Sequence, residues 1–119
     1  MKKILVVDDE EGIRLLYKEE LEEEGYEVEL ARGGEEALTK LSESKPDIVV
    51  LDLKMPGMGG MEVLERVRKQ DKDLPVVICT AYGDYKRDLA TWASDAYVVK
   101  SSDLSELKGV IKGFSEKKE

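Results

Sequence analysis

Residues 46–60 read Pro-Asp-Ile-Val-Val-Leu-Asp-Leu-Lys-Met-Pro-Gly-Met-Gly-Gly, and this stretch decides the fold. Its apolar run from Ile48 to Leu51 is typical of a strand that is buried on both faces, as in a parallel sheet. Asp52 follows directly, and Met55-Pro56-Gly57 then turns the chain out of the strand, because proline restricts its own backbone and that of the residue before it. We therefore expect Asp52 at the rim of a sheet, where a carboxylate is available for chemistry.

Three further apolar runs end on polar residues in the same way. The runs and the residues that follow them are Ile4–Val7 with Asp8 and Asp9, Val76–Cys79 with Thr80, and Ala96–Val99 with Lys100. Residues 26–30 instead alternate between polar and apolar side chains, which is typical of a strand with one solvated face. We therefore expect five strands, with residues 26–30 outermost in the sheet.

Amphipathic segments lie between the expected strands, with apolar residues at helical spacing. The apolar sets are Ile13, Leu16, Tyr17 and Leu21; Ala37, Leu38 and Leu41; Met61, Leu64 and Val67; Leu89, Ala90 and Ala93; and Leu104, Leu107, Val110, Ile111 and Phe114. We expect Gly25 to end the first helix, and Asp103 with Glu106 to form a capping box before the last one. Strands that alternate with helices through right-handed crossovers predict an α/β fold, a parallel sheet covered on both faces.

The length, charge and residue counts of the chain limit the classes of function that are possible. The 119 residues predict a single domain, and no apolar run approaches the ~20 residues of a membrane span. A single cysteine favours a reduced, cytoplasmic protein, and the absence of histidine excludes most zinc sites and catalytic triads. A net charge of -8 argues against direct nucleic-acid binding, because phosphate backbones would repel the domain.

The polar residues after the four inner strands are expected to meet, because the carboxyl ends of parallel strands lie along one edge of the sheet. A plainer interpretation is that polar residues simply mark where strands end. This interpretation is the better one for any single position, but it explains less well why all four inner strands end in this way. Three carboxylates in proximity cannot all ionise cheaply unless a cation lies among them. Oxygen ligands without histidine or cysteine suit Mg²⁺. Lys100 and the Thr80 hydroxyl would then hold a phosphoryl group, with Asp52 as the nucleophile.

These residues resemble a known family. Val-Val-Asp-Asp-Glu at 6–10, the stretch 51–60, Thr80-Ala81 and Lys100 look like the receiver (CheY-like) domain of two-component response regulators, and the likeness spans essentially all 119 residues. The resemblance implies a flavodoxin-like, doubly wound three-layer sandwich with strand order 2-1-3-4-5 and five helices. It also implies a phosphorelay protein that takes a phosphoryl group from a sensor histidine kinase, a phosphotransferase or a small phosphodonor, and that catalyses only its own phosphorylation and dephosphorylation.

The resemblance further implies a role for each matching residue. Asp52 matches the phospho-acceptor, Asp9 the direct Mg²⁺ ligand and Asp8 the ligand that acts largely through water. Lys54 would give its backbone carbonyl to the metal, so the implied metal set also includes Asp52. Thr80 would be the switch hydroxyl.

The resemblance also implies a catalytic lysine, a second switch residue and two residues at the rim of the site. Lys100 matches the lysine that pairs with the phosphoryl group, and Tyr97 the aromatic residue whose rotamer changes with Thr80. Lys54 and Tyr82 occupy the rim positions that border the path of a hydrolytic water. Since both side chains are long, we expect slow self-hydrolysis of the phosphorylated form.

The chain departs from the family pattern at two places. Ser101 follows Lys100 where the family usually has proline in a cis peptide. A cis bond without proline costs about 2.5–4 kcal/mol, so either the site offsets that cost or the bond is trans, and of the two we expect the strained cis bond. The spacing from Thr80 to Lys100 is short, and Ser94-Asp95 stands where Gly-Ala is common. We therefore expect either a shortened fourth helix, opening near Tyr82 and running through Ala93, or a trimmed loop beside it. The departure from the family then falls on the output surface built from helix four, strand five and helix five, and not on the phosphorylation site.

Two other readings remain open. A Mg²⁺-dependent small phosphatase or phosphotransferase could use the same groups, but it usually needs a cap or a second acid, and none stands two positions after Asp52. A flavodoxin-type cofactor binder is disfavoured because Asp8-Asp9-Glu10 would repel phosphate. We expect residues 1–119 to form one receiver domain with no output domain in this chain. The sequence leaves open a stand-alone or excised domain, a downstream protein target or output domain, and a monomer or homodimer.

Overall fold

The computed structural model describes residues 2–81, 95–101 and 103–117. The strands are β1 (Lys3–Val7), β2 (Glu27–Ala31), β3 (Ile48–Leu51), β4 (Val76–Thr80) and β5 (Ala96–Val99). The helices of the described ranges are α1 (Glu11–Glu23), α2 (Gly34–Ser44), α3 (Gly60–Gln70) and α4 (Ser105–Lys117). The expected helix between Tyr82 and Ala93 lies outside the described residues. No helix in the described ranges is long and apolar enough to span a bilayer.

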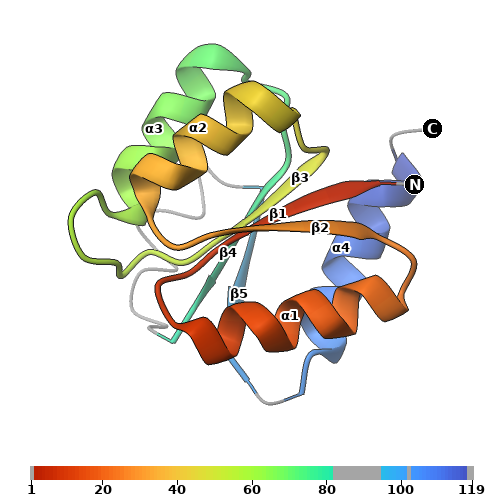
Figure 1. Cartoon of the computed structure of the whole chain (residues 1–119). Helices are drawn as coiled ribbons and strands as arrows, with labels where there is room; N and C mark the ends of the chain where they lie inside the picture. Colours follow the sequence, from red (N-terminus) through yellow and green to blue (C-terminus); the bar gives the residue numbers. More distant parts are fainter. Residues whose placement is uncertain (1, 82–94, 102, 118–119) are drawn as a thin grey trace.

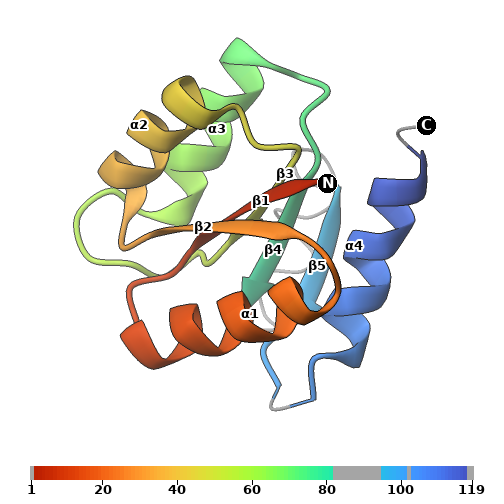
Figure 2. The same ribbon diagram turned by 45° about the vertical axis from the view of Figure 1, so that its right-hand side comes forward.

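The five strands form one sheet in the order β2-β1-β3-β4-β5, and every pairing is parallel. The predicted fold class and strand order are therefore confirmed, with β2 at one edge. Helices α2 and α3 cover one face of the sheet, and α1 and α4 cover the other (Figures 1 and 2). The register aligns Val7 with Leu51, so β1 and β3 finish level with one another. Leu51 pairs with Ile78, and β4 continues two residues further, to Thr80.

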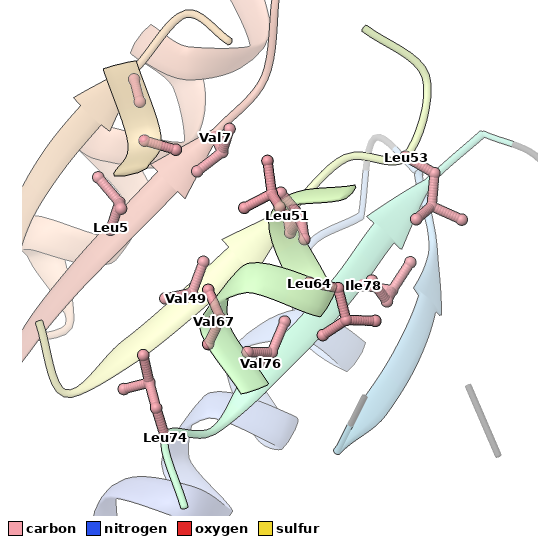
Figure 3. Packing of buried hydrophobic residues seen from close by; sticks show 13 residues of the cluster. Leu5, Val7, Val49, Leu51, Leu53, Leu64, Val67, Leu74, Val76 and Ile78 are labelled. Atoms are coloured by element: carbon pink, nitrogen blue, oxygen red, sulfur yellow. The ribbon is translucent and has the colours of Figure 1, made fainter. Parts of the chain in front are cut away.

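Each inner strand is apolar throughout because both of its faces are covered. Leu5, Val49 and Val76 face α2 and α3 (Figure 3), whereas Ile4 and Val50 face α1 and α4. The alternation places successive side chains in two separate cores. This double burial fixes the strand register, and with it the positions of the residues that follow each strand.

Helix α1 differs from its predicted buried stripe. Tyr17 and Leu21 are buried as expected, but Leu16 is 39% exposed and Arg14 is buried instead. Residues 14, 17 and 21 lie on one helical face, and the guanidinium of Arg14 is held there by a hydrogen bond of 2.8 Å from its Nη1 to the backbone oxygen of Asp8. The prediction for Leu16 was wrong because this polar contact rotates the buried stripe.

The predicted helix ends are confirmed in part. Gly25 has a positive φ of 99°, in keeping with its place just after α1. Asp103 Oδ1 accepts hydrogen bonds from the backbone N–H and the hydroxyl of Ser105, at 2.9 and 2.6 Å. The backbone N–H of Asp103 donates to Ser101 Oγ at 3.1 Å. Both hydrogen bonds of the expected capping box are thus replaced, because the Asp103 carboxylate binds Ser105 and not the N–H of Glu106.

The expected cis bond after Lys100 is also wrong. No cis peptide bond occurs within the described ranges, so Lys100-Ser101 is trans. Since a cis bond at a residue other than proline is costly, a serine at this position favours the trans form. The lysine nevertheless reaches the site described below, so its placement does not require the cis geometry.

Candidate functional site

The carboxyl ends of β1, β3 and β5 bring three charged groups into contact. Lys100 Nζ lies 2.7 Å from Asp8 Oδ2 and 3.2 Å from Asp52 Oδ2. Carboxylate oxygens of Asp8, Asp9 and Asp52 all lie within 4.8 Å of one another. Four residues that the sequence placed at one rim are thus assembled there, although 48 positions separate Asp52 from Lys100.

Backbone hydrogen bonds continue past the strand ends and fix two of the carboxylates. The N–H of Asp52 donates to the Val7 oxygen at 3.0 Å, and the N–H of Asp8 donates to the Ala31 oxygen at 3.1 Å. The N–H of Glu10 donates to Asp8 Oδ1 at 2.9 Å, and that of Lys54 to Asp52 Oδ1 at 3.4 Å. The rigid sheet therefore holds both acids in a defined orientation.

A glycine that sequence reasoning missed also supports Asp52. Gly60 begins α3, and its N–H donates to the Leu53 oxygen at 3.1 Å. A Cβ at this position would lie 2.7 Å from Leu53 Cα and would collide with the backbone oxygen of Asp52. The helix can approach the acceptor strand this closely because Gly60 has no side chain. The pair Gly59-Gly60 was a signal of that close approach.

Burial makes the charges of the site interdependent. Asp52 is 4% and Asp8 is 2% exposed. Burial raises the pKa of the Asp52 carboxyl; Lys100 lowers it less than burial raises it, and Asp8 adds to the rise. Burial alone would lower the pKa of Lys100, but its hydrogen bonds and charge interactions with Asp8 and Asp52 outweigh burial and raise it. Lys100 is therefore a permanent cation here, and Asp52 carries its charge at a cost.

The site opens into a cavity of about 280 Å³. Its lining residues are Asp9, Glu10, Asp52, Lys54, Ala81 and Lys100. Asp9 and Lys54 are exposed, whereas Asp52 lies at the base. The arrangement gives a ligand access to one buried carboxylate.

The structure describes the three remaining predicted site residues only in part. Thr80 ends β4 and pairs with Val99, but the structure describes nothing of its side chain. Tyr97, on β5, is partly buried and packs against the core under α2 and α3. Tyr82 lies outside the described residues. The switch and rim roles therefore stay predictions.

Three carboxylates of the site form a donor set that suits a metal ion. Asp8, Asp9 and Asp52 offer oxygen atoms only, close enough together to share one cation. Hard cations such as Mg²⁺ prefer these ligands, and Mg²⁺ needs few of them because it retains waters. Together with the elevated pKa of Asp52, this donor set fits a divalent cation of that kind.

Comparisons with known proteins agree with this geometry. The family model described as response regulator receiver domain matches residues 4–112. The response regulator TrrA from Thermotoga maritima, solved in complex with Mg²⁺-BeF, is 53% identical and superposes with a TM-score of 0.92 over 96% of this chain and 99% of that one. TrrA in complex with the histidine kinase ThkA is 52% identical, with a TM-score of 0.89 over 96% of this chain and 98% of that one.

Curated relatives differ in length. Sporulation initiation phosphotransferase F of Bacillus subtilis is 37% identical over 115 residues, which cover 95% of this chain and 93% of that protein. The phosphate regulon regulatory protein PhoB of Rhizobium meliloti is 40% identical over 96% of this chain but only 52% of its own length. This chain thus spans nearly all of one relative and about half of the other. The chain belongs to the family of response regulator receiver domains, which are signalling domains.

Proposed function

We propose that the protein is a phosphorylation-controlled switch of a two-component system and that Asp52 accepts the phosphoryl group. One observation carries the proposal: the buried Asp52 carboxylate lies 3.2 Å from the Lys100 ammonium and within 4.8 Å of two further carboxylates. A lone buried acid would be neutral, whereas this one lies beside a cation and a potential metal site. Such an acid can act as a nucleophile.

The chain's own residues would prepare the transfer. Asp8, Asp9 and Asp52, with the backbone carbonyl of Lys54, would hold Mg²⁺, which when bound neutralises carboxylate and phosphoryl charge. Lys100 would move from Asp8 toward the phosphoryl oxygens as charge develops there. An Asp52 oxygen forms the new bond to phosphorus, and the bond from phosphorus to the donor breaks, leaving its electron pair with the donor.

The response to phosphorylation would be conformational. A phosphoryl group adds about -1.5 to -2 charges at the rim of the sheet, and the Thr80 hydroxyl would turn toward it. Tyr97 would then change rotamer, which alters the surface along β5. Lys54 and Tyr82 would slow hydrolysis, so we expect Lys54→Ala combined with Tyr82→Ala to speed loss of the phosphoryl group, followed by intact mass over time.

The partners follow from the same proposal. A sensor histidine kinase or phosphotransferase would supply the phosphoryl group, which is supported by the complex of TrrA with ThkA. A downstream protein or an output domain would read the altered surface, as the longer relatives are transcriptional regulators. We propose that residues 1–119 form one receiver domain that works in the cytoplasm, and that its only catalysis is its own phosphorylation and dephosphorylation.

The test uses acetyl phosphate with Mg²⁺ and intact mass. The native chain should gain a labile adduct of about 80 Da, one phosphoryl group, and Asp52→Asn should not. Asp73→Asn is the matched control, since Asp73 is exposed in the loop after α3 and should leave the adduct unchanged. Turnover of the donor with no adduct, or an adduct retained by Asp52→Asn, would overturn the proposal.

A further inference from the structure

Glu10 is a charged residue of the site that belongs neither to the metal-binding set nor to the groups that hold the phosphoryl group. It occupies the N-cap of α1, a position where Ser, Thr, Asp or Asn usually accept a hydrogen bond from the helix, yet its side chain makes no capping hydrogen bond. Its carboxylate turns instead toward the site, with Oε1 3.4 Å from Lys100 Nζ. The side chain is 65% exposed, so this contact lies at the mouth of the site and not within it.

The position of Glu10 differs from that of the other acids around Lys100. Asp8 and Asp52 are buried and contact the ammonium from below, and Asp9 belongs to the group of oxygens that fits a cation. Glu10 lines the opening of the same cavity. The leaving group of a phosphodonor that enters this cavity would therefore lie near this exposed negative charge, with the exposed Lys54 also in the lining.

We propose that Glu10 is a specificity-determining residue that favours phosphodonors whose leaving group is positively charged before transfer, such as a protonated phosphoimidazole, over donors whose leaving group departs as a carboxylate anion. The inference rests on the proposed function, because it assumes phosphoryl transfer to Asp52. It goes beyond that function by assigning the choice between donor classes to one side chain at the mouth of the site.

The charges of the two reactions differ at the leaving group. In a protonated N-phosphoimidazole the phosphorus–nitrogen bond breaks, its electron pair returns to nitrogen, and neutral imidazole leaves while an Asp52 oxygen bonds to phosphorus. In acetyl phosphate the phosphorus–oxygen bond breaks and acetate leaves with the electron pair and a full negative charge. Glu10 attracts the imidazolium of the first donor and repels the developing acetate of the second.

The expected size of the effect follows from simple electrostatics. A unit charge about 4 Å away in water changes a rate on the order of fivefold, in opposite directions for the two donors. The ratio of the rates should therefore change more than either rate alone. Loss of the contact between Glu10 and Lys100 acts on both donors equally, because Lys100 and Asp52 are common to both reactions, so this indirect effect cancels in the ratio.

The experiment measures Asp52 phosphorylation by N-phosphoimidazole and by acetyl phosphate at saturating Mg²⁺. Glu10→Gln should lower the rate ratio, phosphoimidazole over acetyl phosphate, about tenfold or more, and Glu10→Asp should restore part of it. Glu11→Gln is the matched control: it removes the same charge from the adjacent exposed residue, which does not line the cavity. Its ratio should equal that of the native chain.

Salt provides a second readout that a structural role of Glu10 would not move. Raising the ionic strength shortens the screening length from about 10 Å at 0.1 M to about 3 Å at 1 M. The ratio for the native chain should then fall toward that of Glu10→Gln, while the variant's ratio changes little. An unchanged ratio in Glu10→Gln, or an equal fall in Glu11→Gln, would overturn the inference. Absence of any adduct from either donor on the native chain would instead overturn the proposed function.

Discussion

The two ends of the sheet use the same kinds of charged residue to opposite effect. At the amino end, Asp95 Oδ2 accepts hydrogen bonds from the Val76 N–H at 2.8 Å and from Arg68 Nη2 at 2.6 Å. Arg68 Nη1 also donates to the Leu74 oxygen at 2.7 Å. At the carboxyl end, one ammonium, that of Lys100, is shared by Asp8, Glu10 and Asp52.

The difference lies in the balance of charge. The acid of the amino end has a cation and a backbone donor of its own, so this cluster stabilises the meeting of α3, β4 and β5. At the carboxyl end, burial raises the pKa of Asp52 more than Lys100 lowers it, and Asp8 adds to the rise. The acids there outnumber the one ammonium, so the site is suited to a metal ion and a phosphoryl group. A cluster with balanced charges contributes to the stability of the fold, whereas a cluster with unbalanced charges favours the binding of ligands.

The largest effect is expected from removing the shared cation. Lys100→Met should slow phosphorylation of Asp52 by acetyl phosphate at least 100-fold, because one charged donor to the transferred group is lost. The rate of adduct formation, followed by intact mass, measures this loss. Lys108→Met is the control, because Lys108 does not line the site and its Nζ pairs with Glu20 Oε1 at a distance of 2.6 Å. A loss of less than tenfold in Lys100→Met would show that Lys100 does not act on the phosphoryl group.

The close approach of α3 to the acceptor strand gives the next largest effect. Gly60→Ala should lower the free energy of unfolding by about 2–3 kcal/mol, because the added Cβ meets backbone atoms that cannot move aside. Gly59→Ala is the matched control, since its Cβ would meet only the Leu53 oxygen, at 3.5 Å. Urea unfolding compares the two, and equal losses would contradict the role of Gly60.

Breaking the balanced cluster tests the comparison from the other end. Asp95→Ala should destabilise the fold by about 2 kcal/mol, because the Val76 N–H and Arg68 Nη2 lose the carboxylate that accepts their hydrogen bonds. Phosphorylation by acetyl phosphate should keep its rate. Lys18→Ala, which removes an exposed pair with Glu22 within α1, should change stability by less than about 1 kcal/mol. An Asp95→Ala variant as stable as the native chain would remove the structural half of the comparison.

Removing an acid from the unbalanced cluster at the carboxyl end should stabilise the fold, whereas removing Asp95 from the balanced cluster destabilises it. The stabilisation should be the smaller of the two effects. Without divalent cations, Asp52→Asn should stabilise the fold at neutral pH. The pKa of Asp52 is raised above its ordinary value of 3.8, so its protonated form favours folding, and that contribution is lost as the pH rises through the elevated pKa. The advantage of Asp52→Asn should therefore be small below pH 3.8 and grow above it.

Urea unfolding of the native chain and Asp52→Asn across this range measures the difference. Asp73→Asn, which removes an exposed acid, should show little dependence on pH relative to the native chain. An advantage of Asp52→Asn that shrinks with rising pH would contradict the assigned direction of the pKa.

The fold and the meeting of the charged residues could be predicted because they depend on local patterns. Apolar runs predict buried parallel strands, and the residues after such strands share one edge of the sheet. Asp52 and Lys100 could therefore be placed together from sequence.

The contacts that were missed depend on distant partners. Apolar spacing allows either Leu16 or a neighbour on the buried face of α1, and the Asp8 carbonyl decides in favour of Arg14. The contact of Glu10 with Lys100 joins residues 90 positions apart. Asp95, expected only as a departure from the family, is the acceptor that secures the start of β4.

The central claim, that a single carboxylate among these charges receives the phosphoryl group with a divalent cation, is tested most directly by locating the adduct. The native chain is treated with acetyl phosphate, with Mg²⁺ or with EDTA, and then reduced with borohydride, which converts an aspartyl phosphate to homoserine; peptide mass spectrometry locates the change. We predict homoserine at position 52 alone, and only with Mg²⁺. Homoserine at another aspartate, or an equal yield in EDTA, would contradict the account.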